Sequence, residues 1–265
     1  MKSDYQALIL EQAGEVLTIR MNRPDRLNAL NPQLVSELRD VFQSLYFERS
    51  VRVVILEGAG RAFCAGLDLK EPSGSQGKRS IEQGLDNQRS IAEIYVAMRR
   101  CPQPIISLVQ GAASGGGFAL ALASDIRILA EDARMNAAFI RIGLSSCDMG
   151  VSYFLPRMVG MSLASEYMLT GRFITAQRAM EIGLANRVVH GSELRREADA
   201  FAEDMLHATP LGLRLTKDGL NIAVDVSGLE AAMAIEDRNQ ILTANDPNFA
   251  EGIAAFFEKR KPNYS

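Results

Sequence analysis

Short apolar runs and amphipathic stripes alternate along the first half of the chain. Apolar and polar residues alternate on either side of Ala13-Gly14, over residues 5–12 and 15–21, which predicts an antiparallel hairpin. Apolar residues then recur on one face over residues 32–47, as in a helix packed on a core, and the run Val51–Leu56 is typical of a buried strand. This order of strand, helix and strand indicates an α/β fold. The same patterns predict a helix over 80–100, a strand over 105–109 and a strand over 125–130.

A glycine-rich stretch follows the apolar run Ile105–Val109. Here Gly115-Gly116-Gly117 leads into small and apolar residues up to Ala123, which are typical of a buried helix. The first N–H groups of a helix lack partners and carry a partial positive charge, so an anionic oxygen is the group that they bind best. Glycine lets that oxygen approach closely because no side chain stands in the way. A tight turn with close helix packing is the alternative explanation for the same glycines.

From residue 151 onward the pattern is helical. We expect helices over 151–159, 162–169, 175–181, 192–207, 210–223, 228–243 and 247–259. We place a domain border in this part of the chain, so that residues 1–195 form the core and residues 196–265 form a separate helical region.

The composition argues against several classes of function. The 265 residues are 47 % apolar, which is enough for a sizeable core. The net charge of -3 gives no basic footprint for nucleic acid and argues against binding to a membrane. We expect no secretory signal, because the apolar run near Met1 is short, and no spanning helix, because no run approaches about 20 apolar residues. With two histidines and three scattered cysteines we expect no metal site, and we expect reduced thiols in a cytoplasmic protein.

Two further stretches have the features of ligand-binding loops. Residues 60–70 follow the predicted strand Val51–Leu56, and loops at the carboxyl ends of parallel strands tend to form ligand sites. Residues 20–30 are dense in arginine, which suits a solvated turn and the binding of an anion equally well.

Several short motifs along the chain match one known family, in that family's order. They are Asn22-Arg23-Pro24, Leu27-Asn28-Ala29-Leu30, Phe63-Cys64-Ala65-Gly66-Leu67-Asp68-Leu69, Gly115-Gly116-Gly117, Ser124-Asp125, Leu169-Thr170-Gly171 and Phe256-Phe257-Glu258-Lys259-Arg260. Together they resemble the enoyl-CoA hydratase/isomerase (crotonase) superfamily. The resemblance implies an α/β crotonase-like spiral of ββα units, with a helical C-terminal trimerisation region that forms a homotrimer or a homohexamer. It also implies an acyl-CoA substrate and no separate cofactor, since coenzyme A is part of the substrate.

The resemblance also implies a set of site residues. The backbone N–H groups of Leu67 and Gly116 would hold the thioester carbonyl and stabilise negative charge on its oxygen while a neighbouring C–H bond is broken or made. One such donor is typically worth about 3–4 kcal/mol in the transition state. The residues implied in binding coenzyme A are Arg26, Ala65, Asp68, Leu69, Phe256 and Lys259, with Lys259 supplied by a neighbouring subunit.

The chain departs from the family at the two glutamates that hydratases use for acid and base chemistry. Ala119 and Phe139 occupy those positions by resemblance, and neither side chain can transfer a proton. The remaining acid is Asp148, in a loop that resembles the one where dienoyl-CoA and Δ3,Δ2-enoyl-CoA isomerases keep a catalytic carboxylate. Its spacing from Gly143 is one residue longer than in those relatives.

We therefore expect an isomerase-type enzyme in which Asp148 shuttles a proton along the acyl chain. One carboxylate suffices to move a double bond, whereas hydration needs a positioned water and a proton donor. An acyl pocket formed by Ala119, Phe139, Ile142 and Met149 should raise the pKa of Asp148 and make it a better base. The alternative role for Asp148 is to cap its own loop by bonding nearby backbone amides.

Three other functions fit the same residues. The first is an enoyl-CoA hydratase with atypical acid and base groups. The second is an acyl-CoA hydrolase, because Ser114, Asp148 and His190 follow the serine, acid, histidine order of α/β-hydrolases, although the first glycine of the nucleophile motif is missing. The third is a non-catalytic acyl-CoA-binding paralogue, which would lack both glutamates as this chain does.

Overall fold

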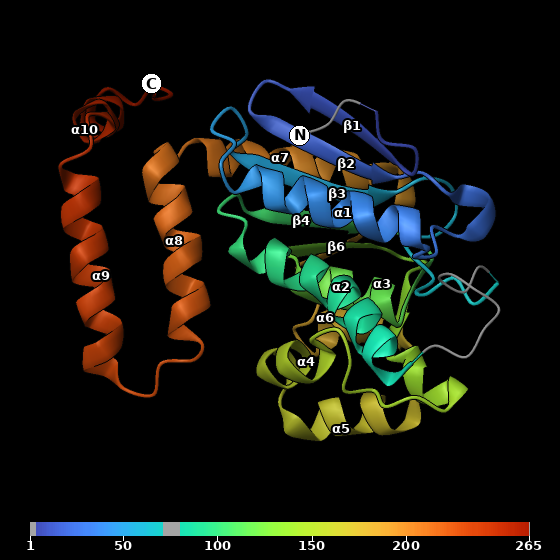
Figure 1. The fold of residues 1–265 in the computed structure, drawn as a ribbon. Helices are drawn as coiled ribbons and strands as arrows, with labels where there is room; N and C mark the ends of the chain where they lie inside the picture. Colours follow the sequence, from blue (N-terminus) through green and yellow to red (C-terminus); the bar gives the residue numbers. More distant parts are fainter. Residues whose placement is uncertain (1–3, 71–79, 265) are drawn as a thin grey trace.

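The computed structural model describes residues 4–70 and 80–264. A six-stranded sheet in the order β1-β2-β3-β4-β6-β9 runs through its core (Figure 1). Its strands are β1 (Leu8–Ala13), β2 (Val16–Met21), β3 (Val53–Gly58), β4 (Ile105–Val109), β6 (Ile126–Ala130) and β9 (Arg187–Val189). β1 and β2 form the predicted antiparallel hairpin, and every other neighbouring pair is parallel. The α/β class is therefore confirmed.

A second sheet was not predicted. It consists of β5 (Ala112–Ser114), β7 (Arg134–Asn136) and β8 (Ile174–Thr175), in that order. Strands of two or three residues are too short to show an alternating pattern, so no periodic signal precedes them. β4, β5 and the following helix form one ββα unit whose strands lie in different sheets, as expected for the spiral.

Helices cover both faces of the large sheet. α1 (Pro32–Leu45) and α2 (Ile81–Arg100) pack against each other on one side, and the Asn31 side chain caps α1 by accepting a hydrogen bond from Leu34 N (3.0 Å). α7 (Leu194–Leu206) covers the opposite face (Figure 1). The other helices of the core are α4 (Val151–Val159), α5 (Met161–Thr170) and α6 (Ala176–Glu181), with short 3-10 turns η1 (Pro24–Arg26), η2 (Ala138–Ile142) and η3 (Gly191–Glu193).

The border expected between residues 195 and 196 falls inside α7. Leu194, Ala198 and Ala202 on this helix are buried against side chains of β3, β4 and β6, and they form one apolar cluster with them. By packing, α7 therefore belongs to the core, and the extended helical region starts after it. The pattern alone could not show this, because it reports that a helix is amphipathic and does not report what the helix covers.

The last three helices leave the core. They are α8 (Pro210–Ala223), α9 (Leu229–Ala244) and α10 (Asn248–Glu258), and they extend to one side of the molecule (Figure 1). No residue of α9 is buried, and Lys217 is the buried residue of α8. Among the described residues, no helix combines the length and the apolar character needed to cross a membrane.

Candidate active site

The helix α3 (Gly116–Ala123) lies in the middle of the core, and all its residues are buried. Its N-cap is Gly115, whose φ of 51° lies in the left-handed region that favours glycine. A Cβ added at Gly117 would lie 2.0 Å from the carbonyl oxygen of Cys64, which is part of the backbone and cannot move away. The close helix packing proposed for these glycines is thus present, and it brings the start of α3 onto the segment around Cys64.

That segment continues past Leu30, with which it forms an isolated parallel bridge. Leu30 N donates to Gly66 O (2.7 Å), and Asp68 N donates to Leu30 O (3.0 Å). Leu67 is the residue opposite Leu30 in this parallel pair. In such a pair the opposite residue directs its own N–H group to the other side of the strand. The Leu67 N–H therefore points away from Leu30.

The other side of this segment faces β5 and the start of α3. Cys64 pairs in parallel with Ala113 of β5, and Leu67 and Gly116 each lie three residues further along. A Cβ added at Gly66 would lie 3.4 Å from Gly116 N, so the two segments are in contact there. Over residues 4–70 and 80–264, neither the Leu67 nor the Gly116 amide donates a hydrogen bond. Two neighbouring N–H groups without partners can bind one anionic oxygen.

Asp148 lies in the loop before α4, and two donors converge on one of its oxygens. Met149 N donates to Oδ1 (2.7 Å), and so does the Nε2 of Gln88 on α2. Oδ2 accepts no hydrogen bond from the described part of the chain. Met149, which donates this bond, has a φ of 49°. This backbone conformation is strained for a residue other than glycine.

Burial raises the pKa of Asp148, against the hydrogen bonds from Met149 and Gln88, which lower it. The net direction is upward, so the predicted rise is confirmed. The expected capping contact is also present, since Asp148 bonds the amide of its own loop. The two roles are compatible because they use different oxygens.

Tyr95 and Met149 connect the Asp148 loop to the start of α3. The Tyr95 hydroxyl lies within hydrogen-bond distance of Gly116 O (3.0 Å) and Met149 Sδ (3.1 Å). A Cβ added at Gly116 would lie 3.1 Å from both the Met149 sulfur and the Tyr95 oxygen. Burial raises the pKa of Tyr95, and the nearby charge of Asp148 raises it further. The residue next to Asp148 in the chain therefore contacts Gly116, which carries one of the two unpaired amides.

The predicted acyl-pocket residues are only partly brought together. Ala119 and Phe139 are buried, and the Phe139 ring would lie 3.6 Å from a Cβ at Gly115. Met149 is also buried. Ile142, at the end of η2, is 52 % exposed, so the single chain does not enclose it in a pocket.

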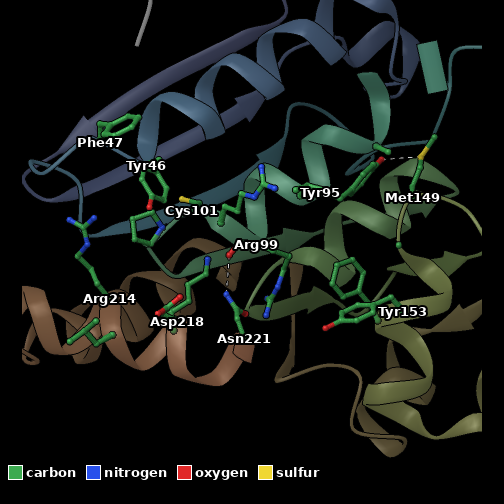
Figure 2. Close-up of a pocket in the computed structure, with 18 of the residues that line it drawn as sticks. Tyr46, Phe47, Tyr95, Arg99, Cys101, Met149, Tyr153, Arg214, Asp218 and Asn221 are labelled. Atoms are coloured by element: carbon green, nitrogen blue, oxygen red, sulfur yellow. Dashed lines mark hydrogen bonds between the residues drawn. The ribbon is translucent and has the colours of Figure 1, made fainter. Parts of the chain in front are cut away.

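A groove of about 970 Å³ opens from the same place. Tyr95 and Met149 line one end of it, and it runs between α2 and α4 to the side chains of α8 (Figure 2). Tyr153 lies on the α4 side, and Asn221 of α8 donates to Arg99 O (2.9 Å). The groove adjoins the site through Tyr95 and Met149, and its lining includes neither Asp148 nor the residues that carry the two amides.

The Asp68 carboxylate, predicted to contact coenzyme A, is turned into the protein. Its Oδ2 pairs with Arg23 (3.1 Å) and its Oδ1 accepts a hydrogen bond from Lys70 N (3.0 Å). Both charged side chains of the ion pair are largely buried, so the pair holds the loops of residues 20–30 and 60–70 together. Asp68 therefore supports the segment that carries Leu67.

The other residues predicted to bind coenzyme A form two separate groups. Arg26 and Leu69 are exposed on the loops beside the site, and Ala65 N donates to Leu27 O (3.0 Å). Phe256 and Lys259 lie at the end of α10, on the opposite side of the molecule from α3 (Figure 1). Within one chain the structure does not bring these two groups together.

The serine hydrolase arrangement is not formed. His190 is exposed, and its Nδ1 lies 2.8 Å from Ser192 Oγ at the start of η3. No hydrogen bond between Ser114, Asp148 and His190 occurs in the described ranges, and these ranges hold no group of three side chains arranged to bind a metal ion. The structure therefore gives a hydrolase triad no support.

Two sheets joined by a ββα unit, with one unpaired amide at the start of a central helix and another in the neighbouring loop, place this protein in the α/β class with a candidate anion-binding site. Comparisons with known proteins identify its family. The family model described as Enoyl-CoA hydratase/isomerase matches residues 11–265, and the chain belongs to this family. The predicted family membership is confirmed.

Individual relatives cover nearly the whole chain. The protein named "Probable enoyl-CoA hydratase echA12" from Mycobacterium bovis is 37 % identical over 97 % of this chain and 92 % of its own length. The 1,2-epoxyphenylacetyl-CoA isomerase of Escherichia coli is 32 % identical over 94 % of this chain and 95 % of its own. The crystal structure of an enoyl-CoA hydratase from Bacillus anthracis is 34 % identical, covers 98 % of this chain and 99 % of its own, and superimposes with a TM-score of 0.92.

Three residues of the site were missed in the sequence. They are Arg23, Gln88 and Tyr95. Tyr95 follows Ile91 and Ile94 on the buried stripe of α2, so a hydroxyl in an otherwise apolar stripe was the available signal. Arg23 belongs to the motif Asn22-Arg23-Pro24, but nothing local marks its partner or marks Gln88, because the partners of Gln88 and Arg23 are 60 and 45 residues away in the chain.

Proposed function

We propose that this enzyme binds an acyl-CoA thioester with its carbonyl oxygen between the Leu67 and Gly116 amides, and that Asp148 moves a proton along the acyl chain. The observation that carries the proposal is the position of Asp148. Its Oδ2 has no partner in the described chain, and its neighbour Met149 contacts Gly116 through Tyr95. These contacts support a base close to one member of the anion-binding pair.

The reaction follows from these groups. Ionised Asp148 takes a proton from the α-carbon of a β,γ-unsaturated thioester, and the electron pair of that C–H bond moves into a conjugated enolate. The two amides stabilise the charge on the enolate oxygen. Asp148 then returns the proton to the γ-carbon, so that the double bond moves to the α,β position. Substrate and product differ only in the position of one hydrogen and one double bond.

Three features support isomerisation over hydration. Ala119 and Phe139 offer no second proton-transfer group near the glycines. The raised pKa of Asp148 makes it a stronger base than an exposed aspartate. One of the relatives is named an isomerase.

We further propose that coenzyme A is bound between copies of this chain, in a homotrimer or homohexamer. Arg26, Ala65 and Leu69 would contact it from one copy, and Phe256 and Lys259 from a neighbour. The support is that Phe256 is 79 % exposed and that both α10 residues lie far from the site of their own chain.

The test is hydrogen exchange. A panel of acyl-CoA thioesters is incubated with the enzyme in deuterated water, and deuterium on carbon is measured by mass spectrometry. We expect exchange with the wild type and a loss of at least a hundredfold in Asp148→Asn, in the range reported for general-base groups. Asp199→Asn, on the exposed face of α7, is the matched control and should exchange normally. Full exchange by Asp148→Asn would remove Asp148 from the mechanism, and no exchange on a thioester that binds would favour a binding protein.

Hydration is the second candidate, because relatives are named enoyl-CoA hydratases. It is distinguished by incubating an α,β-unsaturated thioester in ¹⁸O-labelled water. Incorporation of the label on the β-carbon at a rate above that of double-bond movement would favour hydration.

A further inference from the structure

We propose that Gln88 is the positioning residue for Asp148, holding Oδ1 so that Oδ2 faces the acyl chain. This inference rests on the proposed function, since it assigns a partner to the proposed base. Gln88 is half-buried on the second turn of α2 and reaches across 60 positions of sequence to its acceptor.

The geometry fixes which oxygen reacts. Met149 N and Gln88 Nε2 approach Oδ1 from two different elements, the loop before α4 and the helix α2. With both donors on Oδ1, the carboxylate cannot rotate without losing one of them. A proton is then taken up on Oδ2, whose lone pairs are not used by the described residues.

The same helix contacts Gly116, one member of the anion-binding pair. Tyr95 lies seven residues after Gln88 on α2, at a spacing that places both side chains on one face. Tyr95 contacts Gly116 and Gln88 contacts Asp148, so α2 sets the separation of the base from the oxyanion donor. Seven residues of helix span about 10 Å along the axis, and a rigid helix keeps that spacing constant.

The side chain of Gln88 is an uncharged hydrogen-bond donor, which is compatible with the proposed role of Asp148 as a base. Within the described ranges Asp148 forms no ion pair, and Tyr95 on α2 is the titratable side chain whose pKa responds to it. Burial raises the pKa of Asp148, and the hydrogen bond from Gln88 opposes that rise by stabilising the ionised form. A cation at this position would hold the charge too strongly for efficient proton transfer.

The experiment compares variants of similar length. Gln88→Met removes the donor, Gln88→Lys replaces it by a charged donor, and Gln88→Glu introduces a second carboxylate. In pH profiles of the deuterium exchange rate, the apparent pKa of the base should be lowest in Gln88→Lys, then rise through the wild type and Gln88→Met to Gln88→Glu. If the apparent pKa of the base rises by about one unit in Gln88→Met, the exchange rate of this variant at a pH below that pKa falls about tenfold, because about tenfold less of the base is ionised. KM should change little, because Gln88 acts on the base.

Controls separate this inference from the proposed function. Gln43→Met, on the exposed face of α1, should leave the pH profile unchanged. If Asp148→Asn is inactive but the profiles of all three Gln88 variants coincide with the wild type, the role of Gln88 is overturned while the function stands. If Asp148→Asn is fully active, both fail. The thermal midpoint and the affinity for a CoA thioester identify a variant that is misfolded, and the opposite shifts expected for Gln88→Lys and Gln88→Glu cannot both arise from misfolding.

Discussion

The helices α3 and α9 are both rich in apolar residues, yet α3 is enclosed in the core and α9 packs on only one side, against α8. Every residue of α3 is enclosed by the core, including its glycines. No residue of α9 is buried, and Leu229 on it is 75 % exposed. Apolar side chains left in water lose the stabilisation that burial provides, about 25 cal/mol for each Å².

This difference distinguishes the part of the site that one chain forms by itself from the surface that one chain leaves exposed. Around α3 the amides, Asp148 and their supports all come from residues of the same chain that pack against each other. Around α9 and α10 the chain presents apolar surface without covering it, and two of the residues expected to bind coenzyme A lie there. The groups proposed to react are thus supplied by one folded chain, whereas the proposed binding of coenzyme A depends on association.

The largest effect is expected where α3 is packed most tightly. In Gly117→Ala the new methyl group would lie 2.0 Å from Cys64 O, and we expect a loss of about 3 kcal/mol or more in the free energy of unfolding. Urea unfolding measures it. Gly84→Ala on α2 is the matched control, because nothing lies within 4 Å of its Cβ, and it should gain about 0.5–1 kcal/mol. Equal effects of the two substitutions would show that α3 is not tightly packed.

The next effect concerns the attachment of α8 to the core. Lys217 is 4 % exposed and its Nζ bonds Asp125 Oδ2 (2.8 Å) and Gln103 O (2.8 Å). Lys217→Met should cost about 2 kcal/mol, because it removes the ammonium donor from Gln103 O and from Asp125 Oδ2, which keeps its bond from Ile105 N, while Arg99 still pairs with Asp125. Urea unfolding of the wild type and of the variant measures this difference in the free energy of unfolding. The control is Arg196→Met on α7, which removes an exposed ion pair and should change the free energy of unfolding by less than about 1 kcal/mol.

A smaller effect links stability to pH at Asp148. Its folded pKa is raised, so its contribution to stability is fully present below the unfolded value of about 3.9 and is lost as the pH rises through the folded pKa. At neutral pH the wild type therefore bears the cost of a half-buried charge. Asp148→Asn should unfold at a higher temperature than the wild type at about pH 7, and the difference should vanish below about pH 4. A variant that is less stable at neutral pH would contradict this.

The smallest effect on the folded monomer is expected at α9. Ile241 is 66 % exposed, so Ile241→Asp should change the stability of the single chain by no more than about 0.5 kcal/mol. If copies associate through α9, the same change should convert the assembly to a 29.0 kDa species in analytical ultracentrifugation. The neighbouring Gln240→Asp serves as the control. A wild type that already sediments as a monomer would refute the proposed assembly.

Much of the fold could be predicted because its elements are long enough to show a period. The stripe over 32–47 and the apolar run Ile105–Val109 appear in the structure as α1 and β4. The short strands β5, β7 and β8 were missed, and the border at 195 was misplaced, because both depend on which surfaces meet.

The sequence by itself determined the family, the glycines at the start of α3 and the identity of the one acid, Asp148, in the isomerase-like loop. These features depend only on the type and order of the residues, so sequence motifs are sufficient to identify them. Only the tertiary structure showed that Asp68 pairs with Arg23, that the Tyr95 hydroxyl donates a hydrogen bond to Gly116 O and that Gln88 donates one to Asp148. Each of these contacts joins side chains from segments far apart in the chain, and only packing brings such segments within hydrogen-bond distance.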